Sequence, residues 1–332
     1  MESNRNQFYD VMRGVAILLV VLGHGIQYGY SDYDNNILFR IIYSFHMPLF
    51  MFISGLVVPL GSKVDFLWLK RKFFKLVIPF VAWIFLPFLF SDTKDWNTLI
   101  QKVWNIIQSP DRGGLWFLWV LFLNCCALYV GVTIYEKGMI KNELAVLLGE
   151  YIVIFLLSKT LIRWLGAGSC AYHFVYYSAG YLISKYRIWE KIPQRNIRVF
   201  GGAGTLLYIV LVSMWRRTQL PLWLQPYEAL LPEVALKVLS LGFKYITAFC
   251  GIIAVWYCVK HLFAGCHSVL ALFGRYTLEI YALHGFFITM FGFENSMLGV
   301  MVNSTVSLLL SLMIAYSLEN GKAIEILFGK RV

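Results

Sequence analysis

The sequence predicts an all-α integral membrane protein, a bundle of about ten transmembrane helices. Apolar residues make up 59% of the 332 residues and charged residues only 14%, whereas soluble domains have about 45–50% apolar and about 25% charged residues. The mean hydropathy is +0.66. Because so few charges cannot cover a water-facing surface of this size, the excess apolar surface must face lipid.

Ten segments of the chain approach the roughly 20 apolar residues that a helix needs to cross the hydrocarbon core. They lie near 11–30, 37–60, 74–90, 115–135, 144–162, 171–186, 199–215, 240–260, 273–293 and 297–318. No internal repeat, low-complexity stretch or linker separates them. We therefore expect a single polytopic membrane domain over residues 1–332.

The positions of the 29 Lys and Arg residues orient the bundle, because cytoplasmic loops retain positive charge. Most of them fall on the cytoplasmic side if the N-terminus is inside, so we predict that both termini are cytoplasmic. The net charge of +11 then reflects topology, and no nucleic-acid partner is expected. Two long loops lie on the opposite side, near 91–114 and 216–239, and the second contains Arg216 and Arg217. Long ordered loops are often functional.

Ionisable residues inside the first segment are the first candidates for chemistry, since such residues are costly at membrane depth. Arg13 and His24 are eleven residues apart, or about 1100° around a helix, so they face the same side. Their separation along the axis is about 16 Å. Asp10 lies three residues before Arg13 and can orient its guanidinium. The alternative interpretation is a cytoplasmic anchor and a structural histidine.

Two later segments carry similar groups. His46 lies in the second segment, and Glu279 and His284 lie in the ninth. If these helices are neighbours, the three histidines and the glutamate meet at comparable depth. The six cysteines form no CxxC pair and lie mostly in apolar runs, so neither a disulfide framework nor a metal site is expected.

Several motifs, taken in order, resemble those of the acyltransferase-3 family of membrane O-acyltransferases. The resemblance covers nearly the whole chain. Each motif is weak alone, but the order and spacing together are fairly specific. One departure is that Lys72 and Lys75 stand where two arginines are more usual, and lysine binds phosphate as a point charge. The motifs are Asp10-x-x-Arg13-Gly14 with His24, His46-Met47-Pro48-Leu49-Phe50-Met51-Phe52-Ile53-Ser54-Gly55, Lys70-Arg71-Lys72-x-x-Lys75-Leu76-x-x-Pro79, Leu115-Trp116-Phe117-Leu118 and Tyr281-x-x-His284.

The resemblance implies transfer of an acetyl or similar short acyl group from cytoplasmic acyl-CoA to a sugar hydroxyl. The acceptor would belong to a surface polysaccharide or its lipid-linked precursor, and the enzyme to the plasma (inner) membrane. No tightly bound cofactor is expected. Such a reaction needs a general base, and a neutral histidine suits that role near pH 7. We expect His24 as the base, with His284 or Glu279 orienting it or sharing the proton.

The same reaction needs binding groups for both substrates. We expect the phosphates of acyl-CoA to be bound by basic residues near the cytoplasmic ends of two segments. His46 and Trp116 are weaker candidates for acceptor contacts, because an aromatic face suits a sugar ring. The expected phosphate ligands are Arg13, Arg71, Lys72 and Lys75.

Two other functions remain open from the sequence. A transporter or flippase for a solute or lipid-linked sugar would also need intramembrane His, Glu and Arg. No inverted repeat or pair of matching broken helices is visible, although these are frequent in transporters. A membrane sensor or scaffold is a third possibility, but the chain contains no additional soluble domain to recommend it.

Overall fold

The computed structural model describes residues 7–60, 63–89, 95–109, 114–159, 165–261, 267–319, 321 and 323–330, and within these ranges the regular elements are all helices. The predicted all-α class is therefore confirmed. The helices of the first half are α1 (Gln7–Gly29), η1 (Tyr33–Asn35), α2 (Ile37–Tyr43), α3 (His46–Leu56), α4 (Phe66–Leu89), α5 (Trp96–Gln108), α6 (Trp116–Glu136) and α7 (Glu143–Leu157). Those of the second half are α8 (Ala167–Lys185), α9 (Ile188–Lys191), α10 (Gln194–Met214), η4 (Gln225–Tyr227), α11 (Glu233–His261), α12 (His267–Arg275), α13 (Thr277–Leu283), η6 (His284–Phe286), α14 (Met297–Ser317) and α15 (Ala323–Phe328).

Six helical stretches among the described residues are long and apolar enough to cross a membrane. They correspond to the first, second, fourth, seventh, eighth and tenth predicted segments. The count of ten and the cytoplasmic termini stay predictions. The six stretches are Gln7–Gly29, Ile37–Leu56, Trp116–Glu136, Arg195–Met214, Glu233–His261 and Met297–Ser317.

The second predicted segment is not one regular helix, because the chain breaks between α2 and α3. The carbonyl of Ile41 accepts hydrogen bonds from the hydroxyls of Ser44 at 3.0 Å and Tyr208 at 2.6 Å. Hydroxyl groups that occupy a helix carbonyl compete with the backbone ladder. The break places His46 at the start of α3, where its Nδ1 donates to the carbonyl of Ile42 at 2.9 Å.

The ninth predicted segment, 273–293, is not a continuous helix. Tyr276 separates α12 from α13 with φ −103° and ψ 22°, and helical structure ends at Phe286. The hydroxyl of Thr277 donates to the carbonyls of Phe273 at 3.2 Å and Gly274 at 2.8 Å, so it takes acceptors that a continuing helix would use.

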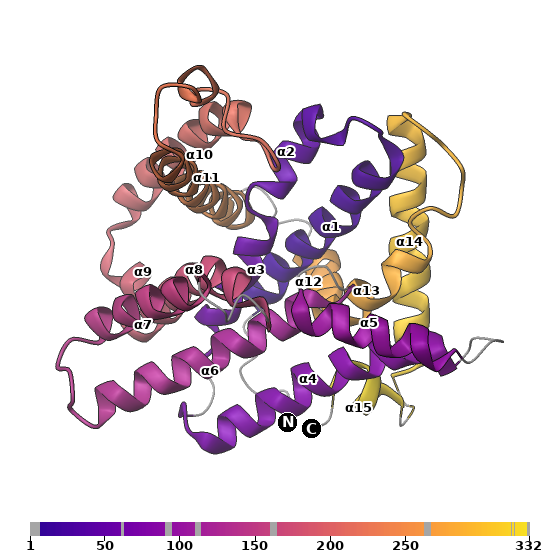
Figure 1. Cartoon of the computed structure of the whole chain (residues 1–332), viewed down its shortest axis with the longest axis horizontal. Helices are drawn as coiled ribbons and strands as arrows, with labels where there is room; N and C mark the ends of the chain where they lie inside the picture. The colour runs from indigo at the N-terminus through magenta and orange to yellow at the C-terminus, as the bar shows by residue number, and fades with distance from the viewer. Residues whose placement is uncertain are drawn as a thin grey trace. The chain divides into compact units, whose positions relative to one another are not determined.

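The chain divides into two compact units, each described by itself. The first comprises Met1–Ile53 and Ile188–Tyr316, and the second comprises Ser54–Arg187 and Ser317–Val332. The single domain expected over 1–332 stays a prediction. In the first unit, α1 packs against α12, α2, α13 and α11, and α10 packs along α11 (Figure 1).

The contact between α1 and α12 is a close approach of two backbones. A Cβ atom at Gly14 would overlap the carbonyl of Leu270, and one at Gly274 would overlap the carbonyl of Asp10. Small residues allow membrane helices to approach this closely. Asp10 precedes Gly14 along α1, but their neighbours Gly274 and Leu270 come in the reverse order along α12, so the two helices are antiparallel. His284, which follows α12 in the chain, lies beside His24, farther along α1. The chain therefore changes direction after α12, and this reversal returns His284 to α1.

In the second unit, α4 packs against α6 and α15, and α7 and α8 pack together. The Trp83 indole N–H donates to the carbonyl of Leu327 at 2.9 Å, which fixes α15 on α4.

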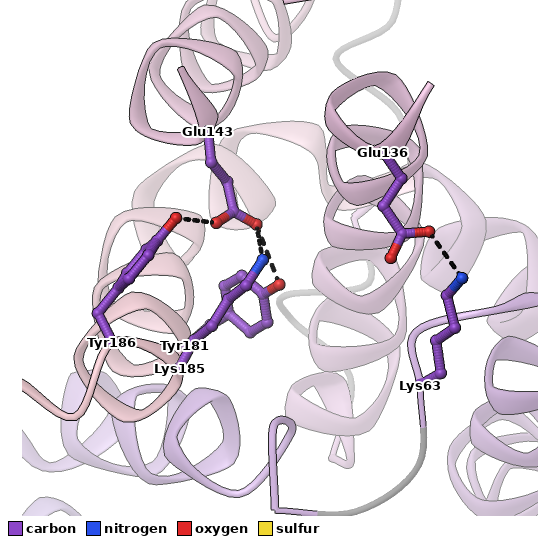
Figure 2. A network of polar contacts seen from close by, with 6 residues as sticks. All are labelled: Lys63, Glu136, Glu143, Tyr181, Lys185 and Tyr186. Atoms are coloured by element: carbon purple, nitrogen blue, oxygen red, sulfur yellow. Dashed lines mark hydrogen bonds and ion pairs between the residues drawn. The ribbon is translucent and has the colours of Figure 1, made fainter. Parts of the chain in front are cut away.

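Figure 2 shows a buried polar cluster between α7 and α8 of this unit. The carboxylate of Glu143, whose side chain is only 1% exposed, accepts from Lys185 Nζ at 2.6 Å. It also accepts from the hydroxyls of Tyr181 at 3.1 Å and Tyr186 at 2.7 Å. The Lys185 ammonium lies within 5.1–5.8 Å of three tyrosine rings, which are Tyr135, Tyr181 and Tyr186.

We expect Glu143→Ala to destabilise the protein by about 3 kcal/mol, because it leaves the half-buried Lys185 cation without its counter-charge and two tyrosine hydroxyls without their acceptor. The midpoint of thermal unfolding in detergent measures this. Glu136→Ala is the matched control, since Glu136 pairs with Lys63 at 3.1 Å on the surface (Figure 2). Exposed pairs contribute about 0–1 kcal/mol. If Glu143→Ala and Glu136→Ala lowered the unfolding midpoint equally, a stabilising role for the Glu143 cluster would be contradicted.

Candidate functional site

A pair of histidines lies in contact within the first unit. His24 Nδ1, on α1, is 2.7 Å from His284 Nε2, at the end of α13. The two rings are nearly parallel, with an interplanar angle of 12°. His284 is buried, whereas His24 is half-buried. The pair was expected from the sequence only if the two helices were neighbours, and the structure brings them together.

The hydrogen bonds around His284 assign the tautomers of the pair. His284 Nδ1 lies 3.0 Å from the carbonyl of Ile280 and 2.9 Å from that of Tyr281, and carbonyls only accept, so Nδ1 carries the proton. In the neutral pair, His284 Nε2 then accepts from His24 Nδ1. The remaining lone pair is on His24 Nε2. The hydroxyl of Ser307 on α14 holds the backbone of His284 by donating to its carbonyl at 2.8 Å.

Aromatic rings lie beside His24. The Tyr43 ring centroid lies 6.4 Å from that of His24 and 4.7 Å from that of His46. The Tyr43 hydroxyl donates to Gln27 Oε1, and Tyr28 lies 6.3 Å from His24. The three histidines expected to meet are thus connected through one tyrosine, which the sequence did not single out.

Arg13 and Asp10 lie at the other end of α1. Arg13 Nη1 is 3.4 Å from Asp10 Oδ1, as the spacing of three residues predicts. The Arg13 side chain is 29% exposed and the Asp10 side chain 4%. Because α1 is unbroken from Gln7 to Gly29, the arginine and His24 stand about 16 Å apart along its axis.

Glu279 is fully buried on α13. It precedes His284 by five residues, which places its Cα–Cβ direction about 140° away around the helix. The expectation that Glu279 orients His24 stays a prediction. Of the two candidates for that role, the structure shows His284 in hydrogen-bond contact with His24.

The other expected phosphate ligands, Arg71, Lys72 and Lys75, belong to α4 in the second unit. Arg71 and Lys75 are exposed. The Lys72 ammonium lies 5.6 Å from the ring of Trp68. Their role in holding acyl-CoA stays a prediction.

Trp116, the weak candidate for an acceptor contact, begins α6 in the same unit. Its ring lies 5.4 Å from that of His173, whose Nδ1 donates to the carbonyl of Ser169 at 2.8 Å. His46, the other weak candidate, belongs to the first unit.

One charged residue beside the histidine pair was not among the predicted site residues. The guanidinium of Arg217 lies 4.8 Å from the Tyr43 ring centroid. Its signal in the sequence was the Arg216-Arg217 pair inside a long predicted loop. A loop residue has no helical period that indicates its neighbours, so only the structure connects it to His24.

The arrangement can perform acid–base chemistry on a bound hydroxyl. His24 Nε2 offers a lone pair on a half-buried ring, and His284 fixes the opposite nitrogen as a donor. This is the geometry of a general base with an orienting partner. Among the described residues, no group of three or more His, Cys, Asp or Glu side chains is placed to hold a metal ion.

The chain is similar to one protein family and to two known proteins. The family described as "Acyltransferase domain" matches residues 6–319. "Nodulation protein NolL" of Mesorhizobium japonicum is 31% identical over 135 residues, 37% of this chain and 35% of that protein. "Nodulation protein NolL" of Sinorhizobium fredii is 51% identical over 57 residues, 16% of each chain. The chain thus spans about a third or less of these relatives, and no solved structure matches it.

The family match extends over nearly the whole chain, including the segments that carry Arg13, His24 and His284. It agrees with the motifs recognised in the sequence and with the apolar helices of the structure. The chain therefore belongs to the acyltransferase-3 family, and its long apolar helices are typical of a multi-pass membrane protein.

Proposed function

We propose that this enzyme transfers an acetyl or similar short acyl group from cytoplasmic acyl-CoA to a sugar hydroxyl. The acceptor is part of a surface polysaccharide or its lipid-linked precursor, and the enzyme resides in the plasma (inner) membrane. The observation that carries the proposal is the 2.7 Å contact between His24 and His284 in a chain of this family.

The histidine pair suits proton transfer from the acceptor. His24 Nε2 takes the proton of the sugar hydroxyl as the oxygen attacks the thioester carbonyl. The O–C bond forms, the C–S bond breaks, and the proton passes from His24 Nε2 to the departing thiolate. His24 Nδ1 keeps its proton and donates to His284 Nε2 throughout, so His284 is a positioning residue. Passage of the acyl group through His24 Nε2 itself is the alternative route.

The donor is bound at a distance from the reacting atoms. Acyl-CoA carries its phosphates far from the thioester, and Arg13 and His24 are similarly separated, by about 16 Å along one helix. Arg13 would bind phosphate through the guanidinium that Asp10 orients. Arg71, Lys72 and Lys75 form a second basic group on α4 that suits the same role. These observations support a donor with charge at one end and the acyl group at the other.

The test of this proposal is mass spectrometry of the surface polysaccharide from cells with and without the chain. We expect the repeat unit to lose the mass of one acetyl or similar short acyl group when the chain is absent. Restoring the wild-type gene should return that mass. Identical glycans in the two strains would sink the proposal and favour transport as the function.

A further inference from the structure

A basic cluster lies near His24 in the first unit, at the opposite end of α1 from Arg13. It is formed by side chains from α2, from the segment between α10 and α11, and from α11. Figure 1 shows that this segment extends from α10 and returns to α11 in the region of α2. The members of this outer basic cluster are Arg40, Arg216, Arg217 and Lys244.

Arg217 is the member closest to the proposed chemistry. Its guanidinium lies over the rings of Tyr43, at 4.8 Å, and Phe39, at 5.9 Å. Tyr43 in turn lies 6.4 Å from His24, and Arg217 is close enough to His24 for an electrostatic interaction. Among the residues that the structure describes, none accepts a hydrogen bond from the Arg217 guanidinium. Its N–H donors are therefore available to a ligand.

Arg217 is exposed, but its backbone is held in place by hydrogen bonds from two sides. Asp34 accepts from the amides of Arg217 at 3.1 Å and Thr218 at 3.3 Å. Lys244 donates to the carbonyl of Arg217 at 3.1 Å. The Asp34 carboxylate thereby fixes the loop, and it supplies one negative charge near Arg40 and Lys244, fewer than the four positive charges of the cluster.

Arg40 adds a second positive charge to the cluster. Its two terminal nitrogens donate to the carbonyls of Ser213 at 2.9 Å and Asn35 at 3.1 Å. Its Nε is buried and finds no hydrogen-bond acceptor within the described part of the chain. Arg40 also interacts electrostatically with Arg216, which is buried, and with the opposite charge of Asp34. Like charges held together in a partly buried place repel one another, and this cost is offset when an anion binds among them.

We propose that the outer basic cluster binds an anionic group of the acyl acceptor, either a sugar carboxylate or a phosphate. This inference rests on the proposed function for the identity of the acceptor. Arg13 and the outer basic cluster lie on opposite sides of His24 along α1. A donor phosphate at the first and an acceptor anion at the second would bring the two reacting groups together at the histidine pair.

Binding measurements separate this inference from the acyl transfer reaction. The purified full-length protein in detergent is titrated with trigalacturonic acid, with the neutral galactotriose and with farnesyl diphosphate. We expect at least one of the anions to bind wild type and to bind Arg217→Gln roughly 10- to 100-fold more weakly, as for the loss of a charged hydrogen bond. Weakening of trigalacturonic acid indicates a carboxylate acceptor, and weakening of farnesyl diphosphate a lipid-linked one.

The controls distinguish a site from general charge attraction. Lys237→Gln removes an exposed cation of α11 that pairs with Glu233. It should leave the affinities for trigalacturonic acid and farnesyl diphosphate unchanged. His24→Ala should also bind the anion as wild type does. If an anion binds in this way while cells with and without the chain have identical glycans, the proposed function fails and the anion site stands.

Three results would overturn the inference. The first is failure of both anions to bind wild type, and the second is equal binding by wild type and Arg217→Gln. The third is displacement of the anion by acetyl-CoA together with weaker acetyl-CoA binding in Arg217→Gln, which would assign the cluster to the donor.

Discussion

Replacing His24 by alanine is expected to reduce the rate of acyl transfer by about a thousandfold, the contribution of a positioned general base. The reason is that His24 Nε2 carries the only ring-nitrogen lone pair of the neutral pair that does not already accept a hydrogen bond within it. Turnover of purified variant and wild-type enzyme, measured as release of free CoA in the presence of acceptor, gives the ratio. The KM for acyl-CoA should change little, because Arg13, the proposed phosphate ligand on α1, is untouched.

His284 separates a positioning role from a catalytic one. His284→Ala removes the acceptor for His24 Nδ1–H, so the His24 ring is free to turn. We expect a loss of turnover smaller than that of His24→Ala. His284→Gln keeps an acceptor in the form of the amide oxygen, and should recover part of the rate. If His24→Ala retained more than a tenth of wild-type turnover with equal protein in the membrane, His24 would not be the base.

The second large effect is expected at the crossing of α1 and α12. Gly274→Ala places a methyl group against the carbonyl of Asp10, and Gly14→Ala places one against the carbonyl of Leu270. Neither backbone atom can rotate away as a side chain does, so the helices must separate. We expect each variant to lose about 3 kcal/mol of stability, the upper part of the range for overpacking. Thermal unfolding in detergent measures the loss.

Gly202→Ala is the matched control for this prediction. Gly202 lies on α10 of the same unit, and a Cβ atom there meets no neighbouring atom. The same substitution should therefore raise stability by up to about 1 kcal/mol, because alanine favours the helix. Gly274→Ala should also lower turnover, since α12 leads into the segment that carries His284. Similar unfolding midpoints for Gly274→Ala and Gly202→Ala would contradict the close crossing.

Part of this site could be predicted from the sequence because it depends on one regular helix. The period of α1 relates Asp10, Arg13 and His24 to one another, and the helix is unbroken in the structure. The contact between His24 and His284 depends instead on a chain reversal. Where the reversal begins, the hydroxyl of Thr277 donates hydrogen bonds to two carbonyls of the preceding turn. A hydropathy pattern does not record such bonds, so the sequence predicted one continuous helix there.

Loop structure was the other limit of prediction. The loop expected near 91–114 contains the helix α5. Its N-cap Asp95 accepts from the amide of Asn97 at 2.9 Å, a signal that sequence analysis can use. The position of Arg217 had no comparable local signal, because it depends on Asp34, nearly two hundred residues earlier in the chain.

The unbroken α1 has a consequence for the choice of acyl donor. Because one continuous helix carries both Arg13 and His24, the distance of about 16 Å between them along the axis is fixed. In an acyl phosphate the negative charge lies only a few bonds from the acyl carbon, so the molecule is too short to reach both residues. Under the proposed roles, a donor must therefore be long enough to place its phosphates at Arg13 and its acyl carbon at His24, and shorter activated acyl groups are excluded.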